Sequence, residues 1–291
     1  MKNRISSTLL WGSIFLILSP GSGFTREQPN SDSPAFRTVP ELRAAFDLLY
    51  SQKFTEARHS LESWESRNPE QPFGEVAIAA SYLFEELDQQ KVLTSDFFLD
   101  QKRFLRGIDG SPNPERMRHF RDSLKKAREL AHQRQAVNPN DSEALFALTL
   151  ADGMESDALA ILEKKRLEAL KHMKEANKHA KRLLARRPDA ADAYVALGIS
   201  NYIIGSMSSG SRFALWFGGI HGDKSLGMNQ VARTAASGRY LRPYAKIILA
   251  LAARRENQPA LAERLFRELK EEYPNNTLYA LEFSKARRVS L

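Results

Sequence analysis

The apolar positions of the chain recur at helical spacing over most of its length. Apolar residues at intervals of three and four form segments, which are separated by breaks containing Pro, Gly or Asn. No sustained stretch rich in Val, Ile and Thr alternates between apolar and polar residues, so we expect no strands. The pattern predicts an all-α protein.

Residues 243–276 form the clearest unit of this pattern. The first half predicts a helix that ends in a turn at 257–259. The second half carries a small, an aromatic, an aliphatic and a proline residue at spacings of four, three and five: Ala262, Phe266, Leu269 and Pro274. We expect two antiparallel helices that touch at the small residue, with the proline closing a unit of 34 residues.

Weaker copies of this spacing precede the clear unit. They are Ala57, Leu61, Trp64 and Pro69; Ala127, Ala131 and Pro139; and Ala176, Ala180, Leu183 and Pro188. A first-helix pattern close to W-x₂-L-G-x₂-Y follows Pro188, with its last Tyr one residue late: Tyr194, Leu197, Gly198 and Tyr202. Over residues 40–290 the chain therefore resembles the tetratricopeptide repeat (TPR) family, and it is similar to exported bacterial TPR-like proteins of undefined role. The resemblance implies a right-handed α-solenoid of antiparallel helix pairs.

The closing prolines are spaced irregularly, at intervals of 70, 49 and 86 residues. These intervals are not multiples of 34, so we expect two insertions, at about 91–114 and 205–224. A third long segment, residues 157–187, contains neither Gly nor Pro, which predicts one helix of about 45 Å. One face of that helix is apolar and the other is basic, with Lys164, Lys171 and Lys178. We favour a solvated face over a phosphate or lipid site.

The N-terminal residues have the layout of a secretory signal peptide. Lys2 and Arg4 precede an apolar run, which ends in the small residues of 19–23. We expect a signal peptide at 1–23, a flexible Pro- and Ser-rich linker at 24–36 and a helical repeat domain at 37–291. An uncleaved anchor is the alternative. Cleavage would remove Lys2 and Arg4 and lower the net charge from +8 to +6.

Few residue patterns suggest chemistry. The chain has no cysteine, which excludes disulfides, a thiol nucleophile, cysteine-bound metal and a lipid anchor on cysteine. His172 and His179 lie seven residues apart, too far along a helix to share a metal ion directly. His221 and Asp223 are a histidine–carboxylate pair in a Gly-rich loop that could serve a hydrolase, but we favour Asp223 as the cap of a helix starting near Lys224. We expect no cofactor.

The TPR resemblance implies that a protein or peptide segment binds in a concave groove lined by first helices. We therefore expect partner contacts on the fourth and fifth units, at Tyr194, Gly198, Asn201, Lys246, Ile247 and Arg254. The aromatic loop 212–219, with Phe213, Trp216 and Phe217, is expected to fold back over the groove; a partner or a membrane surface is the alternative.

These features predict a non-catalytic, exported binding or scaffold protein of the periplasm or cell envelope. The alternative is a peripheral protein that binds anionic lipid through loop 212–219 and its basic faces. A hydrolase that uses His221 and Asp223 is a minor alternative. We expect no nucleic acid partner, because the basic face has no interleaved aromatic residues and export would remove most access.

Overall fold

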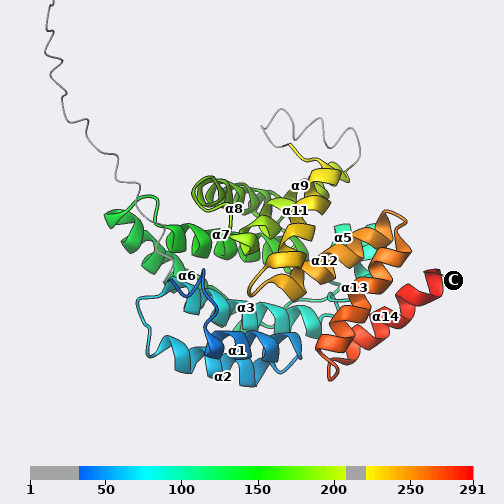
Figure 1. The fold of residues 1–291 in the computed structure, drawn as a ribbon, viewed down its shortest axis with the longest axis horizontal. Coiled ribbons are helices and arrows are strands. Elements are labelled where there is room, and N and C mark those ends of the chain that lie inside the picture. The colour runs from blue at the N-terminus through cyan, green and yellow to red at the C-terminus, as the bar shows by residue number, and fades with distance from the viewer. Residues whose placement is uncertain (1–32, 208–220, 291) are drawn as a thin grey trace, which may run out of the picture.

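A computed structural model describes residues 33–207 and 221–290 (Figure 1). The regular structure in this part of the chain is helical and includes no strand, which confirms the all-α prediction. The α-helices are α1 (Pro40–Tyr50), α2 (Phe54–Glu65), α3 (Pro72–Gln89), α4 (Ser95–Leu99), α5 (Gln101–Arg106), α6 (Pro114–Val137), α7 (Ser142–Asp157), α8 (Arg166–Arg186), α9 (Tyr194–Gly205), α11 (Lys224–Ser237), α12 (Arg242–Arg255), α13 (Pro259–Glu272) and α14 (Thr277–Ser290). A π-helix (Ala158–Leu162) extends α7, and a 3₁₀ turn (Ala191–Ala193) precedes α9.

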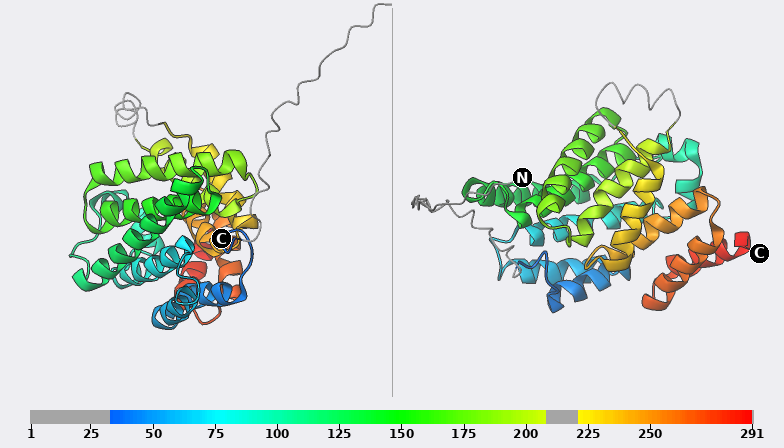
Figure 2. Two further views of the ribbon diagram at one scale, coloured as in Figure 1. Left: turned by 90° about the vertical axis from the view of Figure 1, so that its left-hand side faces the viewer. Right: turned by 45° about the horizontal axis from the view of Figure 1, so that its top comes forward.

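Helices that follow one another along the chain pack side by side (Figures 1 and 2). The predicted unit at 243–276 corresponds to α12 and α13. Asn257, in a left-handed conformation with φ 55°, lies between them, and Pro259 begins α13. The buried face of α13 holds Ala262, Phe266 and Leu269, as the spacing predicted.

The predicted single helix over 157–187 is wrong. The chain leaves the π-helix at Glu163 and reverses at Lys164, whose φ is 63°. The Lys165 amide then donates to the Leu159 carbonyl at 2.8 Å, and α8 packs back against α7. The reversal buries the small residues of α8 against α7, and a left-handed lysine closes the turn without Gly or Pro.

The first insertion is helical and packs against the rest of the fold. Phe97 of α4 is buried, α4 contacts α12, and the Ile108 amide donates to the Ile161 carbonyl at 3.1 Å. Gly107 precedes Ile108 with a φ of 81°, and a Cβ there would come within 2.5 Å of the Ile161 oxygen. Only glycine therefore fits where the insertion meets the π-helix. Most of the second insertion lies outside the described residues.

Residues 33–36 do not belong to a flexible linker. Ala35 and Phe36 are buried in the main core, because this short polar stretch carries an apolar pair that packs on Phe146. The expected signal peptide 1–23 and the rest of the expected linker lie outside the described residues.

The N-terminal segment is fastened to a loop about 200 residues away in sequence. The buried hydroxyl of Tyr240 donates to a carbonyl of this segment and accepts from the Val39 amide at 3.1 Å. Its ring lies 5.0 Å from Phe46 and 5.1 Å from Phe73, centroid to centroid. These aromatic residues form the centre of the fold.

The first helix also meets the last ones. Tyr50 donates to the Tyr240 carbonyl at 2.8 Å, Asn276 donates to the Tyr50 carbonyl at 2.7 Å, and Tyr273 pairs with Asp47 at 3.1 Å. In Figure 1, α1 and α2 accordingly lie close to α13 and α14. Repeats of an open solenoid contact only their neighbours. The contacts of α1 go beyond that expectation, because the N-terminal segment bridges distant parts of the stack.

Candidate functional site

Two of the expected partner-binding residues hold helices together instead. Lys246 is buried, and its ammonium lies 2.9 Å from the Glu268 carboxylate on α13. Arg254 donates to Ser95 of α4 at 2.6 Å and lies 3.9 Å from Glu282 of α14. These contacts hold α12 to neighbouring helices, and partner binding at Lys246 and Arg254 stays a prediction. Ile247 is partly exposed and packs against the main core.

The residues expected from the fourth unit contact neighbouring elements. Tyr194 stacks beneath the Arg233 guanidinium at 4.0 Å, and Asn201 donates to the Gln230 side chain at 2.9 Å. Gly198 faces α11 directly, since a Cβ there would lie 2.6 Å from a methyl group of Val231. Glycine at this position allows α9 and α11 to approach closely, so Gly198 is a packing residue and not a groove residue.

The structure describes only some of the loop residues for which we predicted a role. Phe213, Trp216 and Phe217 lie outside the described residues. His221 is exposed, and the Asp223 carboxylate accepts the Leu226 amide at 2.7 Å as the cap of α11. The predicted capping role of Asp223 is confirmed, while its use in a hydrolase stays a hypothesis.

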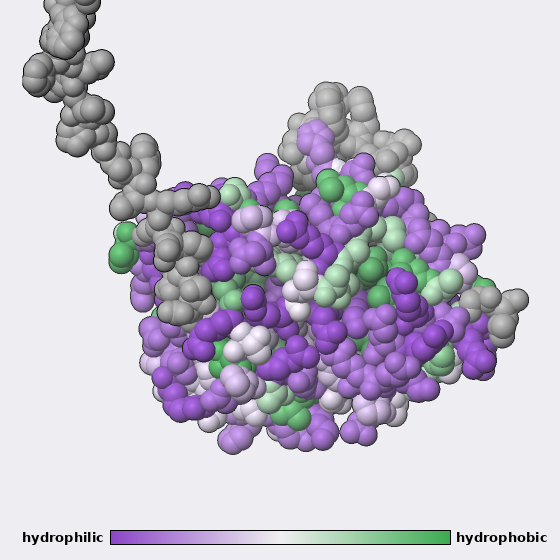
Figure 3. All heavy atoms as spheres, in the orientation of Figure 1, coloured by the Kyte–Doolittle hydropathy of each residue, from purple (hydrophilic) through white to green (hydrophobic). Residues whose placement is uncertain are grey.

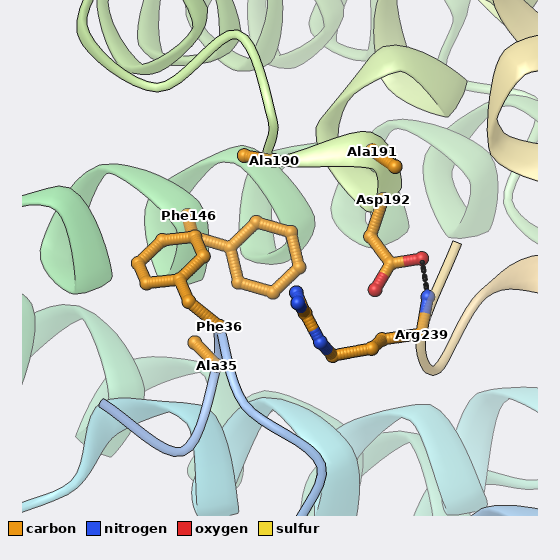
Figure 4. Close-up of a pocket in the computed structure, with 7 residues that line it drawn as sticks. All are labelled: Ala35, Phe36, Phe146, Ala190, Ala191, Asp192 and Arg239. Carbon is orange, nitrogen blue, oxygen red and sulfur yellow. Dashed lines mark hydrogen bonds between the residues drawn. The ribbon is translucent and has the colours of Figure 1, made fainter. Parts of the chain in front are cut away.

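A small pocket lies where the N-terminal segment meets α7 and the loop before α12 (Figure 4). The Asp192 carboxylate accepts the backbone amides of Arg239, Tyr240 and Leu241 at 2.9–3.2 Å. Burial raises the pKa of Asp192, and these hydrogen bonds oppose the rise. The space beside Phe36 has room for about one water molecule. We interpret this pocket as part of the packing that holds the loop before α12 in place.

Both histidines of α8 face one carboxylate of α7. His172 lies 3.2 Å and His179 3.8 Å from Asp152, which also accepts from Arg128 of α6 at 3.0 Å. Burial lowers the pKa of His179, although the Asp152 charge opposes this. Among the described residues, no three His, Asp or Glu side chains are placed to hold a metal ion. Spacing in sequence put the histidines on one face but could not reveal Asp152.

Helix α6 supplies cations to the buried carboxylates of α3 and α7. Its basic residues pair with acidic residues on both sides: Arg116 with Glu86 (2.5 Å), Lys126 with Glu75 (2.6 Å), Arg121 with Glu155 (3.3 Å), Arg128 with Asp152 (3.0 Å) and Arg134 with Glu143 (3.3 Å). Many of the basic residues of α6 therefore stabilise the fold by pairing with buried carboxylates. The pairs also fix α6 between α3 and α7, because breaking such a pair leaves a buried charge.

Asp157, at the end of α7, departs from this pattern. Its side chain is partly exposed, and no hydrogen bond or ion pair engages it in the described part of the structure. Burial alone raises the pKa of Asp157 from 3.8 to about 7.

Asp157 influences a tyrosine of α12, and that tyrosine contacts an aromatic residue of α3. Burial raises the pKa of the Tyr244 phenol on α12, and the charge of Asp157 raises it further. The Tyr244 ring makes an edge contact with Phe84 of α3, with centroids 5.6 Å apart. Tyr244 and Phe84 are both partly exposed, as are Ile247 and Ile248 of α12. Figure 3 shows hydrophobic residues at the surface in the region of α12. We call Asp157, Tyr244 and Phe84 the acidic aromatic cluster.

A comparison with models of known protein families found no match, and a comparison with curated proteins found no significant relative. None of the helices in 33–207 and 221–290 is long and apolar enough to cross a membrane. The acidic aromatic cluster is the best candidate for a functional site, because Asp157 has no hydrogen bond or ion pair among the described residues.

Proposed function

We propose that the chain is a non-catalytic binding or scaffold protein that engages a protein or peptide segment at the acidic aromatic cluster and the adjoining surface of α12. One observation carries the proposal: within residues 33–207 and 221–290 Asp157 has no ion pair, and Tyr244 and Phe84 are partly exposed, while the neighbouring carboxylates have cations. A segment that covered this surface would bury apolar area and give the carboxylate a partner.

The repeat pattern of the sequence supports a TPR-type binding role, because stacked helix pairs present extended surfaces to other chains. The N-terminal residues support export to the periplasm or cell envelope. Our proposal moves the binding surface from buried residues of α12, such as Lys246, to the partly exposed Phe84 of α3, Asp157 of α7 and Tyr244 of α12. The change follows from the internal contacts of Lys246 and Arg254.

Site-specific photo-crosslinking tests the location of this surface. A photoreactive side chain at Ile248, which is partly exposed on α12, is compared with one at Val137, which is 90% exposed at the end of α6. In an envelope extract we expect a discrete protein adduct from position 248 and none from position 137. Equal adducts from both positions, or none from either, would refute the proposal.

A second candidate is a peripheral membrane protein that binds anionic lipid. It is supported by the exposed lysines of α8, Lys171 and Lys178, on the face opposite the buried small residues. Flotation with vesicles of anionic and neutral lipid tests it. Binding to anionic vesicles alone, weakened in Trp216→Ala and Phe217→Ala, is the expected result. Absence of binding to anionic vesicles would exclude it.

A further inference from the structure

Helix α8 presents a straight row of residues to solvent. Its members are all exposed and recur at intervals of four and three: Leu167, Lys171, Lys174, Lys178 and Lys181. At about 100° per residue they lie within about 40° of one line, opposite the buried side chains of α8, and the four lysines span about 15 Å. In the left view of Figure 2, α8 runs along the upper edge of the molecule, so the row faces outward. We call these five residues the lysine row.

The lysine row is not paired with the rest of the fold, whereas the cations of α6 pair with buried carboxylates of other helices. Within residues 33–207 and 221–290, Lys171, Lys174 and Lys181 form neither an ion pair nor a hydrogen bond. Lys178 pairs with Glu175 of the same helix at 2.9 Å, and its side chain is 60% exposed. Like charges three and four residues apart on a helix repel one another, so an anionic surface along the row would offset an unfavourable interaction.

The acidic residues of α8 lie to one side of the row. A solvated helix surface typically mixes both signs of charge along one face. The exposed acidic residues Glu168 and Glu175 lie on one flank, roughly 80–100° from the centre of the row. The centre is therefore purely basic over about three turns, which favours an anionic partner over the solvated face expected from the sequence.

The chemistry of the row favours a lipid surface over an acidic segment of protein. Lysine carries a point charge on a flexible stem, which suits mobile phosphate headgroups, whereas a fixed acidic segment is held better by the planar fork of arginine. A straight row on an outer edge can touch a plane along its whole length. Leu167, at the N-terminal end of the row, is 78% exposed, and an apolar side chain beside lysines suits the boundary between headgroups and acyl chains.

We propose that the lysine row lies on a membrane surface of anionic phospholipid, with its ammonium groups at the phosphates and Leu167 in the boundary below them. This inference rests on the second candidate function and deepens it, because it names the surface that meets the lipid and the headgroup charge that this surface requires. It is independent of the binding of a protein segment at the acidic aromatic cluster.

Vesicle flotation with two charge-matched variants tests the row. The row variant replaces its four lysines with glutamine, and the control variant makes the same change at four exposed lysines elsewhere in the fold: Lys53, Lys102, Lys125 and Lys270. Glutamine is a good helix former, and circular dichroism checks that both variants fold. Because the two variants have the same net charge and the same N-terminal residues, a difference between them reports the position of the lysines.

Binding is measured on vesicles of phosphatidylcholine with phosphatidylglycerol and on vesicles of phosphatidylcholine alone. We expect the unmodified chain to prefer the anionic vesicles, the row variant to bind them about 100-fold more weakly, and the control variant to stay within about 5-fold of the unmodified chain. Raising the salt concentration from about 0.1 M to about 1 M should abolish the preference, because the screening length falls from about 10 Å to about 3 Å. An equal loss in the two variants, or a preference that survives high salt, would overturn the inference.

The apolar end of the row has its own matched pair. Leu167→Gln should weaken binding to the anionic vesicles about 10-fold, while Leu281→Gln, at a 50% exposed position on α14, should leave it unchanged. Equal binding by Leu167→Gln and the unmodified chain would contradict the placement of Leu167 in the lipid.

The outcomes separate this inference from the functions proposed above. Anionic binding that both variants retain or lose equally would preserve the second candidate function and remove the lysine row. Absence of binding by the unmodified chain would remove both, and the crosslinking adduct at position 248 would still test the first function. Tighter binding of soluble polyglutamate than of anionic vesicles, lost in the row variant alone, would assign the row to an acidic protein segment instead.

Discussion

Replacing Asp157 with asparagine is expected to stabilise the protein above pH 7 and to change little below pH 4. The folded chain raises the pKa of this carboxyl from 3.8 to about 7, so the fold retains the proton more tightly than the unfolded chain does. That contribution to stability is fully present below the pKa of the unfolded chain and is lost as the pH rises to about 7. Asparagine is nearly isosteric and does not titrate, so the variant avoids this loss.

The size of the effect follows from the shift in pKa. A shift of about three units corresponds to about 4 kcal/mol at 1.36 kcal/mol per unit, which is an upper limit. The Asp157 side chain is partly exposed, and water around its carboxylate screens the cost. We expect the variant to gain about 2 kcal/mol at pH 8 relative to the unmodified chain.

Urea unfolding followed by circular dichroism at pH 4.5 and pH 8 measures the effect. Both proteins share all other titrating groups, so the difference between them isolates Asp157. Glu271→Gln, at an exposed position, serves as the control and should show no pH-dependent difference. If the free energy gained by Asp157→Asn differed by less than about 0.5 kcal/mol between the two pH values, the interpretation of Asp157 as a desolvated, unpaired carboxylate would be wrong.

Further substitutions test the packing of the helices and the hydrogen bonds of Tyr240 at the centre of the fold. Gly198→Ala should destabilise the protein by about 1–3 kcal/mol, because the new Cβ would lie 2.6 Å from Val231 of α11, and a lower unfolding midpoint would show it. Gly153→Ala on α7 has open space around its Cβ and should stabilise the chain by about 0.5–1 kcal/mol, so equal effects of the two alanines would contradict the packing. Tyr240→Phe should cost about 1–3 kcal/mol in urea unfolding, because it leaves the buried Val39 amide without its acceptor; an unchanged midpoint would contradict that role.

Local patterns in the sequence were sufficient to predict helices and their buried faces. The spacing of Ala262, Phe266 and Leu269 identified the inner face of α13, and Asp223 was identified as a cap, because both depend on residues within one or two turns. The reversal at Lys164 was missed because helix ends usually show Gly or Pro, and a lysine adopts the left-handed conformation there instead. The internal role of Lys246 was missed because its acidic partner lies on the next helix.

The error over residues 157–187 also explains why the candidate site could not be seen in the sequence. In one long helix, Asp157 would be an ordinary solvated residue facing away from the apolar stripe. In the structure, the chain turns back within eight residues, and the π-helix that begins after Asp157 carries the backbone into that turn. The acidic aromatic cluster therefore depends on two features that local sequence patterns did not reveal: a helix end without Gly or Pro, and the position of Tyr244 on α12. Asp152 and Glu155, which precede Asp157 on α7, pair with arginines of α6. Asp157 lies at the end of α7, beyond the reach of these arginines. Among the described residues, the lack of an ion pair at Asp157 thus follows from where α7 ends.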